Sequence, residues 1–367
     1  MTVQRHAPPL PAIVPLIIAL AQTPASPGVA RIAEVETLAS VAALPAHIAG
    51  TFQQLTSCQQ TASGDYFIFD RRSHAVCVAP TGLDSARKLI TIGAEPGRVI
   101  DPSAFDLAAD GSFIVADAPG GEPRIQIFLA SGSTVTAFRI PGRALPRITS
   151  GNLVLGGLTA IEYTGRSVYL SQPELGALIA EYATDGRPIR TFGDLRRTGH
   201  EGDAGVHLAM NSGLVVANPS GGFYFVCLAG VPQFRKYDAA GQLIFERHIE
   251  GPELDAFVQS LPTTWRRQRA DAGELPVVLP SVQAAAADRA GNLWVATAVG
   301  VTYVYDAAGE KTRTVRFRAA GTVSPTAMSF TPGGRLLVAP GCYAFDVGRP
   351  VKGASPARNR AAFGSTR

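Results

Sequence analysis

Charged residues and long apolar runs are both scarce in this chain. Only 17% of its 367 residues are charged, and no apolar segment approaches the roughly 20 residues that span a bilayer. Familiar catalytic motifs are missing too: the sequence has no G-x-S-x-G, H-E-x-x-H or Walker loop, and no G-x-G-x-x-G after a strand. A transmembrane protein is therefore not expected, nor are the enzyme classes that these motifs mark.

Glycine, by contrast, is abundant and recurs in a fixed pattern. A turn glycine followed by an apolar run occurs in "SGDYFIFD" (63–70), "DGSFIVAD" (110–117), "TGRSVYLS" (164–171), "SGGFYFVC" (220–227), "AGNLWVAT" (290–297) and "GGRLLVAP" (333–340). After each of the first five copies come a second run, a second turn glycine about 20 residues after the first, and a third run. Short apolar runs bounded by Gly, Asp and Ser are strand signals, and a four-stranded unit repeated every 40 to 50 residues or so is typical of a propeller blade. The sequence therefore predicts an all-β, six-bladed β-propeller over residues 31–349.

The predicted ring needs a closure, because open sheet edges expose unpaired backbone groups. The sixth copy, "AMSFTPGGRLLVAPGCYAFDV" (327–347), is not followed by an outer strand. A spare extended segment, "RIAEVETLASVAAL" (31–44), lies upstream of the first copy. We expect this segment to be the outer strand of the last blade, so that the two ends of the chain pair.

The cysteines are Cys58, Cys77, Cys227 and Cys342, and none has the C-x-x-C spacing of a metal site. In the predicted ring they fall in blades one, one, four and six. Blades one and six adjoin, whereas blade four lies across the channel. At most one disulfide is feasible in this arrangement, and buried free thiols are the expected state.

Both ends of the chain differ from the repeats. Residues 1–21 combine a short apolar stretch with the small-x-small pattern Ala19-Leu20-Ala21, which predicts a signal peptide and export to the periplasm or the extracellular space; a disordered leader is the alternative. The tail, 350–367, holds 4 of the 33 basic residues and no acid, so the remainder has 29 of each sign. A nearly neutral ring does not favour nucleic-acid binding. We expect a disordered tail and a monomer.

The units "DGSFIVADAPGGEPRIQIFLASGSTVTAF" (110–138) and "DRAGNLWVATAVGVTYVYDAAGEKTRTV" (288–315) resemble the NHL repeats of six-bladed propellers. In those repeats an acidic turn and a glycine precede a strand that ends in V-A-D/T, and a strand that ends near Y/F-D-x-x-G follows. The resemblance implies the fold. It does not choose among the lyases, lactonase-like neighbours, sensor domains and scaffolds that share this fold.

Two segments interrupt the repeat, and function is often found in such interruptions. The first, "GDLRRTGHEGDAGVHLAMNSG" (193–213), connects blade three to blade four at the channel mouth. It could ligate a divalent cation or supply an acid and a base, contact a ligand without doing either, or be a polar loop. Its candidate residues are Arg196, Arg197, His200, Glu201, Asp203 and His207.

The second interruption, residues 251–280, predicts a short helical insertion between blades four and five. "PELDAFVQSL" places Leu254, Phe257, Val258 and Leu261 on one helical face. The following "WRRQR" supplies guanidinium groups suited to carboxylates or phosphates, unless they only face water. These candidates are Arg266, Arg267 and Arg269.

The predicted inner strands are mostly small or apolar, and their polar exceptions are Asp106, Glu162, Asn218 and Asp288. Glu162, Asn218 and Asp288 could hold Ca²⁺ through oxygen ligands, but each also stands three residues before a turn glycine, where it can cap the turn.

The sequence favours an exported module that binds an anionic small molecule, a peptide or a protein at its channel mouth, with no cofactor. The alternative is a lyase or lactonase-type hydrolase that depends on Ca²⁺ or Zn²⁺. It would use His200, Glu201, Asp203 and His207.

Overall fold

The computed structural model describes residues 35–348, apart from 141–147, 151–152, 156–159 and 271–272. These residues all belong to one compact unit, Glu34–Arg367. The predicted signal peptide (1–21) and basic tail (350–367) lie outside the described residues. No helix among the described residues is long and apolar enough to cross a membrane.

The chain forms a six-bladed β-propeller, as the glycine spacing predicts. Blades one to five are antiparallel sheets with strand order equal to chain order, and blade six has three strands. Blade one comprises β2 (Leu55–Gln60), β3 (Tyr66–Asp70), β4 (Ala75–Ala79) and β5 (Arg87–Ile90), and blade two β6 (Ala104–Leu107), β7 (Phe113–Asp117), β8 (Arg124–Phe128) and β9 (Thr134–Arg139). Blade three comprises β12 (Ile161–Tyr163), β13 (Ser167–Ser171), β14 (Ala177–Ala183) and β15 (Pro188–Asp194), and blade four β16 (Gly213–Ala217), β17 (Phe223–Cys227), β18 (Gln233–Tyr237) and β19 (Leu243–His248). Blade five comprises β22 (Val282–Ala287), β23 (Leu293–Thr297), β24 (Thr302–Tyr305) and β25 (Lys311–Arg318), and blade six β27 (Ala327–Phe330), β28 (Leu336–Ala339) and β29 (Tyr343–Phe345).

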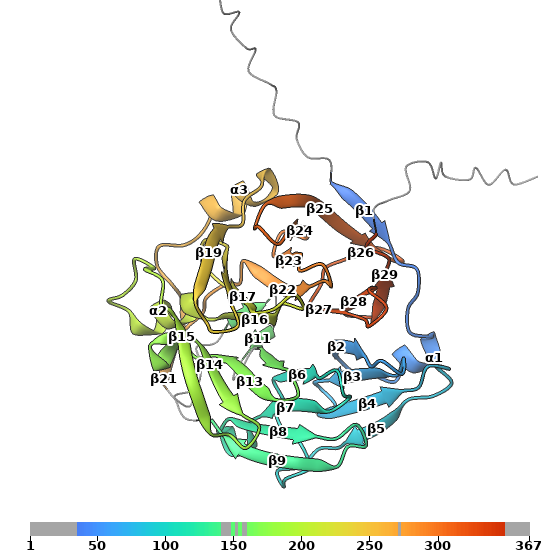
Figure 1. Ribbon diagram of the computed structural model, residues 1–367. Helices are drawn as coiled ribbons and strands as arrows, with labels where there is room; N and C mark the ends of the chain where they lie inside the picture. The colour runs from blue at the N-terminus through green and yellow to red at the C-terminus, as the bar shows by residue number, and fades with distance from the viewer. Residues whose placement is uncertain (1–34, 141–147, 151–152, 156–159, 271–272, 349–367) are drawn as a thin grey trace, which may run out of the picture. The chain divides into compact units, whose positions relative to one another are not determined.

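The ring closes through its inner strands and through the cores between its blades. Each of β2, β6, β12, β16 and β22 contacts the inner strand of the next blade, and β27 contacts β2 (Figure 1). Six buried apolar clusters lie between blades, and each contains residues from two adjacent blades. Successive side chains of a strand point to opposite faces, so Val115 packs toward blade one and Ile114 toward blade three. Burial on both faces explains why the middle strands read as continuous apolar runs.

The expected closing strand occupies a different place from the one predicted. β1 (Glu36–Ala39) pairs in parallel with β25, the outer strand of blade five, and only residues 41–42 continue to β29 of blade six. The prediction that 31–44 is the outer strand of blade six was therefore wrong in its partner. β25 extends past the end of β24 and offers a long edge, whereas β29 has three residues. Arg313 of β25 also binds both carboxylate oxygens of Glu36, at 2.9 and 2.8 Å.

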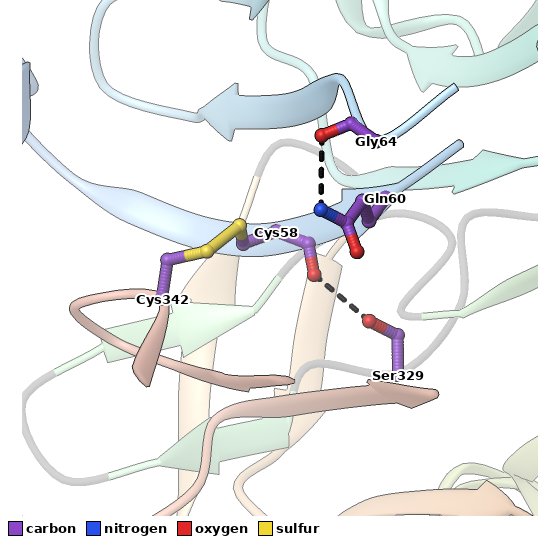
Figure 2. The surroundings of a disulfide bond; sticks show 5 residues. All are labelled: Cys58, Gln60, Gly64, Ser329 and Cys342. Carbon is purple, nitrogen blue, oxygen red and sulfur yellow. Dashed lines mark hydrogen bonds between the residues drawn. A yellow bond between two sulfur atoms is a disulfide. The ribbon is translucent and has the colours of Figure 1, made fainter. Parts of the chain in front are cut away.

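A disulfide joins Cys58 of β2 to Cys342, in the turn between β28 and β29 (Figure 2). The expectation of free thiols was wrong for this pair, because adjoining blades one and six bring the two residues together across 284 residues of sequence. Cys77 and Cys227 are buried free thiols, as expected. Ser329 Oγ also donates a 2.9 Å hydrogen bond to the carbonyl oxygen of Cys58, so covalent and polar contacts fix this junction together.

The connections between blades carry most of the remaining elements, and two 3-10 turns lie within blades two and three. The predicted helical insertion is present as α3 (Pro252–Gln259), with Leu254 buried, and the hairpin β20 (Arg267–Ala270) and β21 (Gly273–Pro276) follows it. The other elements are helices α1 (Ala46–Ala49) and α2 (Ala204–Asn211), the hairpin β10 (Ile148–Ser150) and β11 (Leu153–Leu155), the short strand β26 (Thr322–Val323), and the 3-10 turns η1 (Pro119–Gly121) and η2 (Pro173–Leu175). In a four-stranded antiparallel blade, the outer strand ends on the side where the inner strand begins. All these blade-to-blade connections therefore lie on one face of the ring, which we call the mouth face.

Candidate functional site

A cavity of about 590 Å³ lies between the inner strands of all six blades. One part of its wall is apolar and small, because β22 contributes Ala284 to Ala287 and β16 contributes Leu214. Small side chains on an inner strand leave space at the centre of a ring, so this alanine run is one reason that the cavity exists. The cavity is large enough for a small molecule.

A continuous set of polar contacts runs along the opposite part of the wall. Gln59 of β2 donates a 2.9 Å hydrogen bond from Nε2 to Asp106 Oδ1 of β6, and its Oε1 accepts one of 3.1 Å from the Leu107 amide. Asp106 Oδ2 accepts a 2.7 Å hydrogen bond from the backbone amide of Tyr163 in β12. Glu162, the neighbour of Tyr163, also lines the cavity. Blades one, two and three thus hold one carboxyl pair, Asp106 and Glu162.

The two carboxyls alter each other's protonation. Burial raises the pKa of Asp106 to about 6, against which the hydrogen bonds from Tyr163 and Gln59 act. Burial also raises the pKa of Glu162 well above its usual range, and the neighbouring charge of Asp106 raises it further. A hydrogen bond from the Ala217 amide opposes this rise. The pair therefore binds a proton more readily than two solvent-exposed carboxyls would.

A guanidinium group lines the same cavity on the mouth side. Arg71 lies in the turn from β3 to β4, and its Nε donates a 3.2 Å hydrogen bond to the Pro102 carbonyl, just before β6. Asp101 lies close enough to raise the pKa of Arg71, although burial outweighs this effect and lowers it. Asp101 itself stands 4.0 Å from His74. The cavity therefore has a basic group at one end and acidic groups deeper in the channel.

The sequence offered Glu162, Asn218 and Asp288 as an alternative calcium site. These three residues do not meet at one point of the cavity. Only Glu162 lines it. Asn218 Oδ1 accepts from Ser220 N at 3.1 Å, and Asp288 Oδ1 accepts from Ala290 N and Asn292 N, both at 2.9 Å. Asn218 and Asp288 thus cap their turns. Among the described residues, no group of three or more His, Cys, Asp or Glu side chains is placed to hold a metal ion.

The structure brings the two interrupting segments together on the mouth face. Arg267 of the β20–β21 hairpin forms an ion pair with Asp203, the N-cap of α2. His200 and Trp265 meet edge to face, with ring centroids 6.2 Å apart. These contacts connect segment 193–213 to segment 251–280. They agree with the sequence prediction that both segments open on one face.

Several predicted ligand residues are engaged within the protein. The Arg196 guanidinium donates to the backbone carbonyls of Met210, Val231 and Ala229. Glu201 Oε1 accepts from the Thr198 amide at 2.8 Å, and His207 Nδ1 lies 2.8 Å from Thr198 Oγ1. Three of the predicted ligand residues are exposed, and their side chains have no partner among the described residues: Arg197, Arg266 and Arg269.

Sequence reasoning singled out Asp106 and Glu162 but missed Gln59 and Arg71. Gln59 lies near the end of a strand whose glutamines, "CQQ", resemble those of any exposed strand, and Arg71 lies in an ordinary turn. Only the closure of blade one beside blade two directs these side chains to the channel. No local signal in the sequence marks them.

No family model matches the sequence, and no curated protein matches it. Similar solved structures include a streptogramin B lyase, with 12% identity, a TM-score of 0.49 and coverage of 78% of this chain and 76% of that one. A virginiamycin B lyase from Staphylococcus aureus has 11% identity, a TM-score of 0.48 and coverage of 78% and 77%. A gluconolactonase from Xanthomonas campestris has 14% identity, a TM-score of 0.48 and coverage of 85% and 95%. The six-bladed fold follows from this chain's own strand pairing, and membership of the NHL family is not confirmed.

Proposed function

We propose that this protein is a ligand-binding β-propeller whose site is the central cavity, where Asp106 and Glu162 receive a cationic group of the ligand. The observation that supports the proposal is one carboxyl pair held by neighbouring blades inside a cavity of about 590 Å³. The proposal moves the site expected at the mouth loop into the channel, because Arg196 and Asp203 of that loop already have partners.

A cation suits this pair better than an anion. Ionising both of two neighbouring, half-buried carboxyls costs free energy through desolvation and mutual repulsion. Without a ligand, the pair therefore keeps a proton. An ammonium group within hydrogen-bond distance would lower both pKa values, release that proton and satisfy the carboxylate oxygens. Proton release on binding is therefore a specific consequence of this site.

Titration calorimetry with n-alkylamines tests the proposal. Binding measured in buffers of different ionisation enthalpy should show proton release near pH 6 to 7, roughly the range above the ordinary carboxyl pKa. Asp106→Asn and Glu162→Gln should each abolish both binding and release. Glu174→Gln is a matched control, since burial also raises the pKa of Glu174 but this residue does not line the cavity. Equal binding by all four proteins, or no binding by any, would overturn the proposal.

A second candidate function is acid–base catalysis by the same pair, of the lyase or lactonase type. It is supported by the position of Asp106 and Glu162 side by side on the cavity wall, because two interacting carboxyls in different surroundings can serve as base and acid. The described residues offer no metal-ligating group, so we derive no step through Ca²⁺ or Zn²⁺. A panel of lactones and esters, assayed with wild type and both carboxyl variants, tests this function. Turnover by wild type that is lost in both variants would support catalysis. If wild type turns over none of these compounds, this second function is wrong.

A further inference from the structure

Arg71 is the one cationic side chain lining the cavity among the described residues. Its guanidinium uses Nε for the Pro102 carbonyl, and both Nη groups are without a hydrogen bond or ion pair within the described chain. Among the nearby acids, Asp70 accepts the amides of Gln53 and Gln54, at 2.8 and 2.9 Å, whereas Asp101 acts on Arg71 electrostatically and forms no ion pair with it. A guanidinium with two free donor groups, fixed at Nε, is prepared for an anion.

The register of blade one sets the distance between Arg71 and the carboxyl pair. Asp70 pairs with Leu55 at the start of β2, whereas Phe67 pairs with Gln59, which holds Asp106. Four residues of strand separate the two levels, or roughly 13 Å at about 3.3 Å per residue. Arg71 Nε reaches the carbonyl of Pro102, which precedes Asp106 by four residues. The two ends of the cavity therefore lie one small molecule apart along the channel.

The wall between these ends is mainly apolar. Ala285 and Ala287 of β22 and Leu214 of β16 line the cavity and present no polar side-chain atom. A ligand that spans from Arg71 to Asp106 would pass these residues with its middle section. Hydrocarbon there would bury apolar surface at no hydrogen-bonding cost.

From this arrangement we infer that the cavity takes a linear zwitterion, with an ammonium group at Asp106 and Glu162 and a carboxylate at Arg71, joined by a short apolar chain. The inference rests on the proposed function and adds the anionic end, the direction of the ligand and its length. It also assigns Arg71 as a ligand-binding residue. The anionic ligand expected from the sequence reappears here as one end of a bipolar molecule.

The test compares ω-amino acids, from aminobutyrate to aminooctanoate, with n-alkylamines of the same chain length, using titration calorimetry at about pH 8, which lies above the pKa of Asp106. One member of the amino-acid series should bind at least about tenfold more tightly than its amine, because a charged hydrogen bond to guanidinium is gained. Arg71→Gln should remove this advantage and leave the affinity for the amine unchanged. Arg72→Gln is the matched control, an exposed neighbour outside the cavity, and should keep the advantage.

The outcomes separate this inference from the proposed function. If amines bind but no amino acid gains over its amine, or if Arg71→Gln keeps the gain, the zwitterion is wrong and the cationic site stands. If neither series binds wild type, both are wrong. If a carboxylate without an amino group binds as tightly as the best amino acid, the cavity is a site for anions alone.

Discussion

Gln59 holds Asp106 from the neighbouring blade, donating to its Oδ1 at 2.9 Å while accepting from the Leu107 amide at 3.1 Å. One amide side chain thus orients the carboxyl and anchors its strand. The same β2 strand presents Cys58 to blade six, so its successive residues secure the ring on both sides. The site and the ring closure therefore share one structural element.

Gln59→Leu should destabilise the fold and weaken the site. It leaves the Leu107 amide and one Asp106 oxygen without partners, which costs about 1–3 kcal/mol of unfolding free energy. Urea unfolding measures this loss, with Gln60→Leu as control, since Gln60 Nε2 bonds only the carbonyl of Gly64, at 2.9 Å, outside the cavity. Equal losses in the two variants would contradict a special role for Gln59.

Glu162→Gln should stabilise the protein increasingly as pH rises. A carboxyl whose folded pKa lies above its unfolded value contributes stability below the unfolded pKa and loses it as pH rises through the folded one. For Asp106 that window runs from 3.8 to about 6, and Glu162, with its pKa also raised, loses stability in the same direction. Melting temperatures of variant and wild type should therefore diverge as the pH rises above the ordinary carboxyl range, with the variant higher. A difference that does not vary with pH would show that Glu162 is not perturbed.

Arg196→Ala and Arg197→Ala should behave differently, although the two arginines are adjacent. Arg196 donates to three backbone carbonyls, so its loss should cost about 2 kcal/mol or more of unfolding free energy. Arg197 is exposed, and its loss should stay within about 0.5 kcal/mol. Chemical denaturation of both variants checks this. Similar values for the pair would mean that the carbonyl contacts of Arg196 contribute little.

Replacing both Cys58 and Cys342 with alanine should lower the unfolding free energy by about 2–5 kcal/mol, because the bond connects residues 284 apart and restricts the unfolded chain. A reductant should bring wild type to the level of the variant and leave the variant unchanged. Thiol counting in the denatured, unreduced protein should find Cys77 and Cys227 free. Four reactive thiols would show that the bond is absent in solution.

A chain that begins at Leu44 should melt below a chain that begins at Glu34. The shorter chain lacks β1, its pairing with β25 and the Glu36–Arg313 ion pair, whose side chains are each only 21% exposed. It also exposes the edge of β25, a risk for aggregation. Thermal unfolding of the two truncated proteins gives the comparison. Identical midpoints would mean that β1 does not contribute to closure.

The sequence by itself determined the repeated blade, because the signals that define it are local. At the turn before β23, Asp288 accepts the amides of Ala290 and Asn292, and Gly291 adopts a φ of 79°, a left-handed conformation that suits glycine. Such turns, alternating with apolar runs, fix strands, their order and the number of blades within a few residues of each signal. The helix α3 could be predicted for the same reason.

Only the tertiary structure decided what meets across the ring. Gln59 and Asp106 stand 47 residues apart, and Cys58 and Cys342 stand 284 apart. Each pairing depends on how closed blades align, which no local pattern encodes. The pKa of Glu162 depends in turn on burial and on the neighbouring Asp106, and the engagement of Arg196 depends on carbonyls that blade four supplies. Local patterns thus gave the fold, while contacts between distant residues gave the site its chemistry.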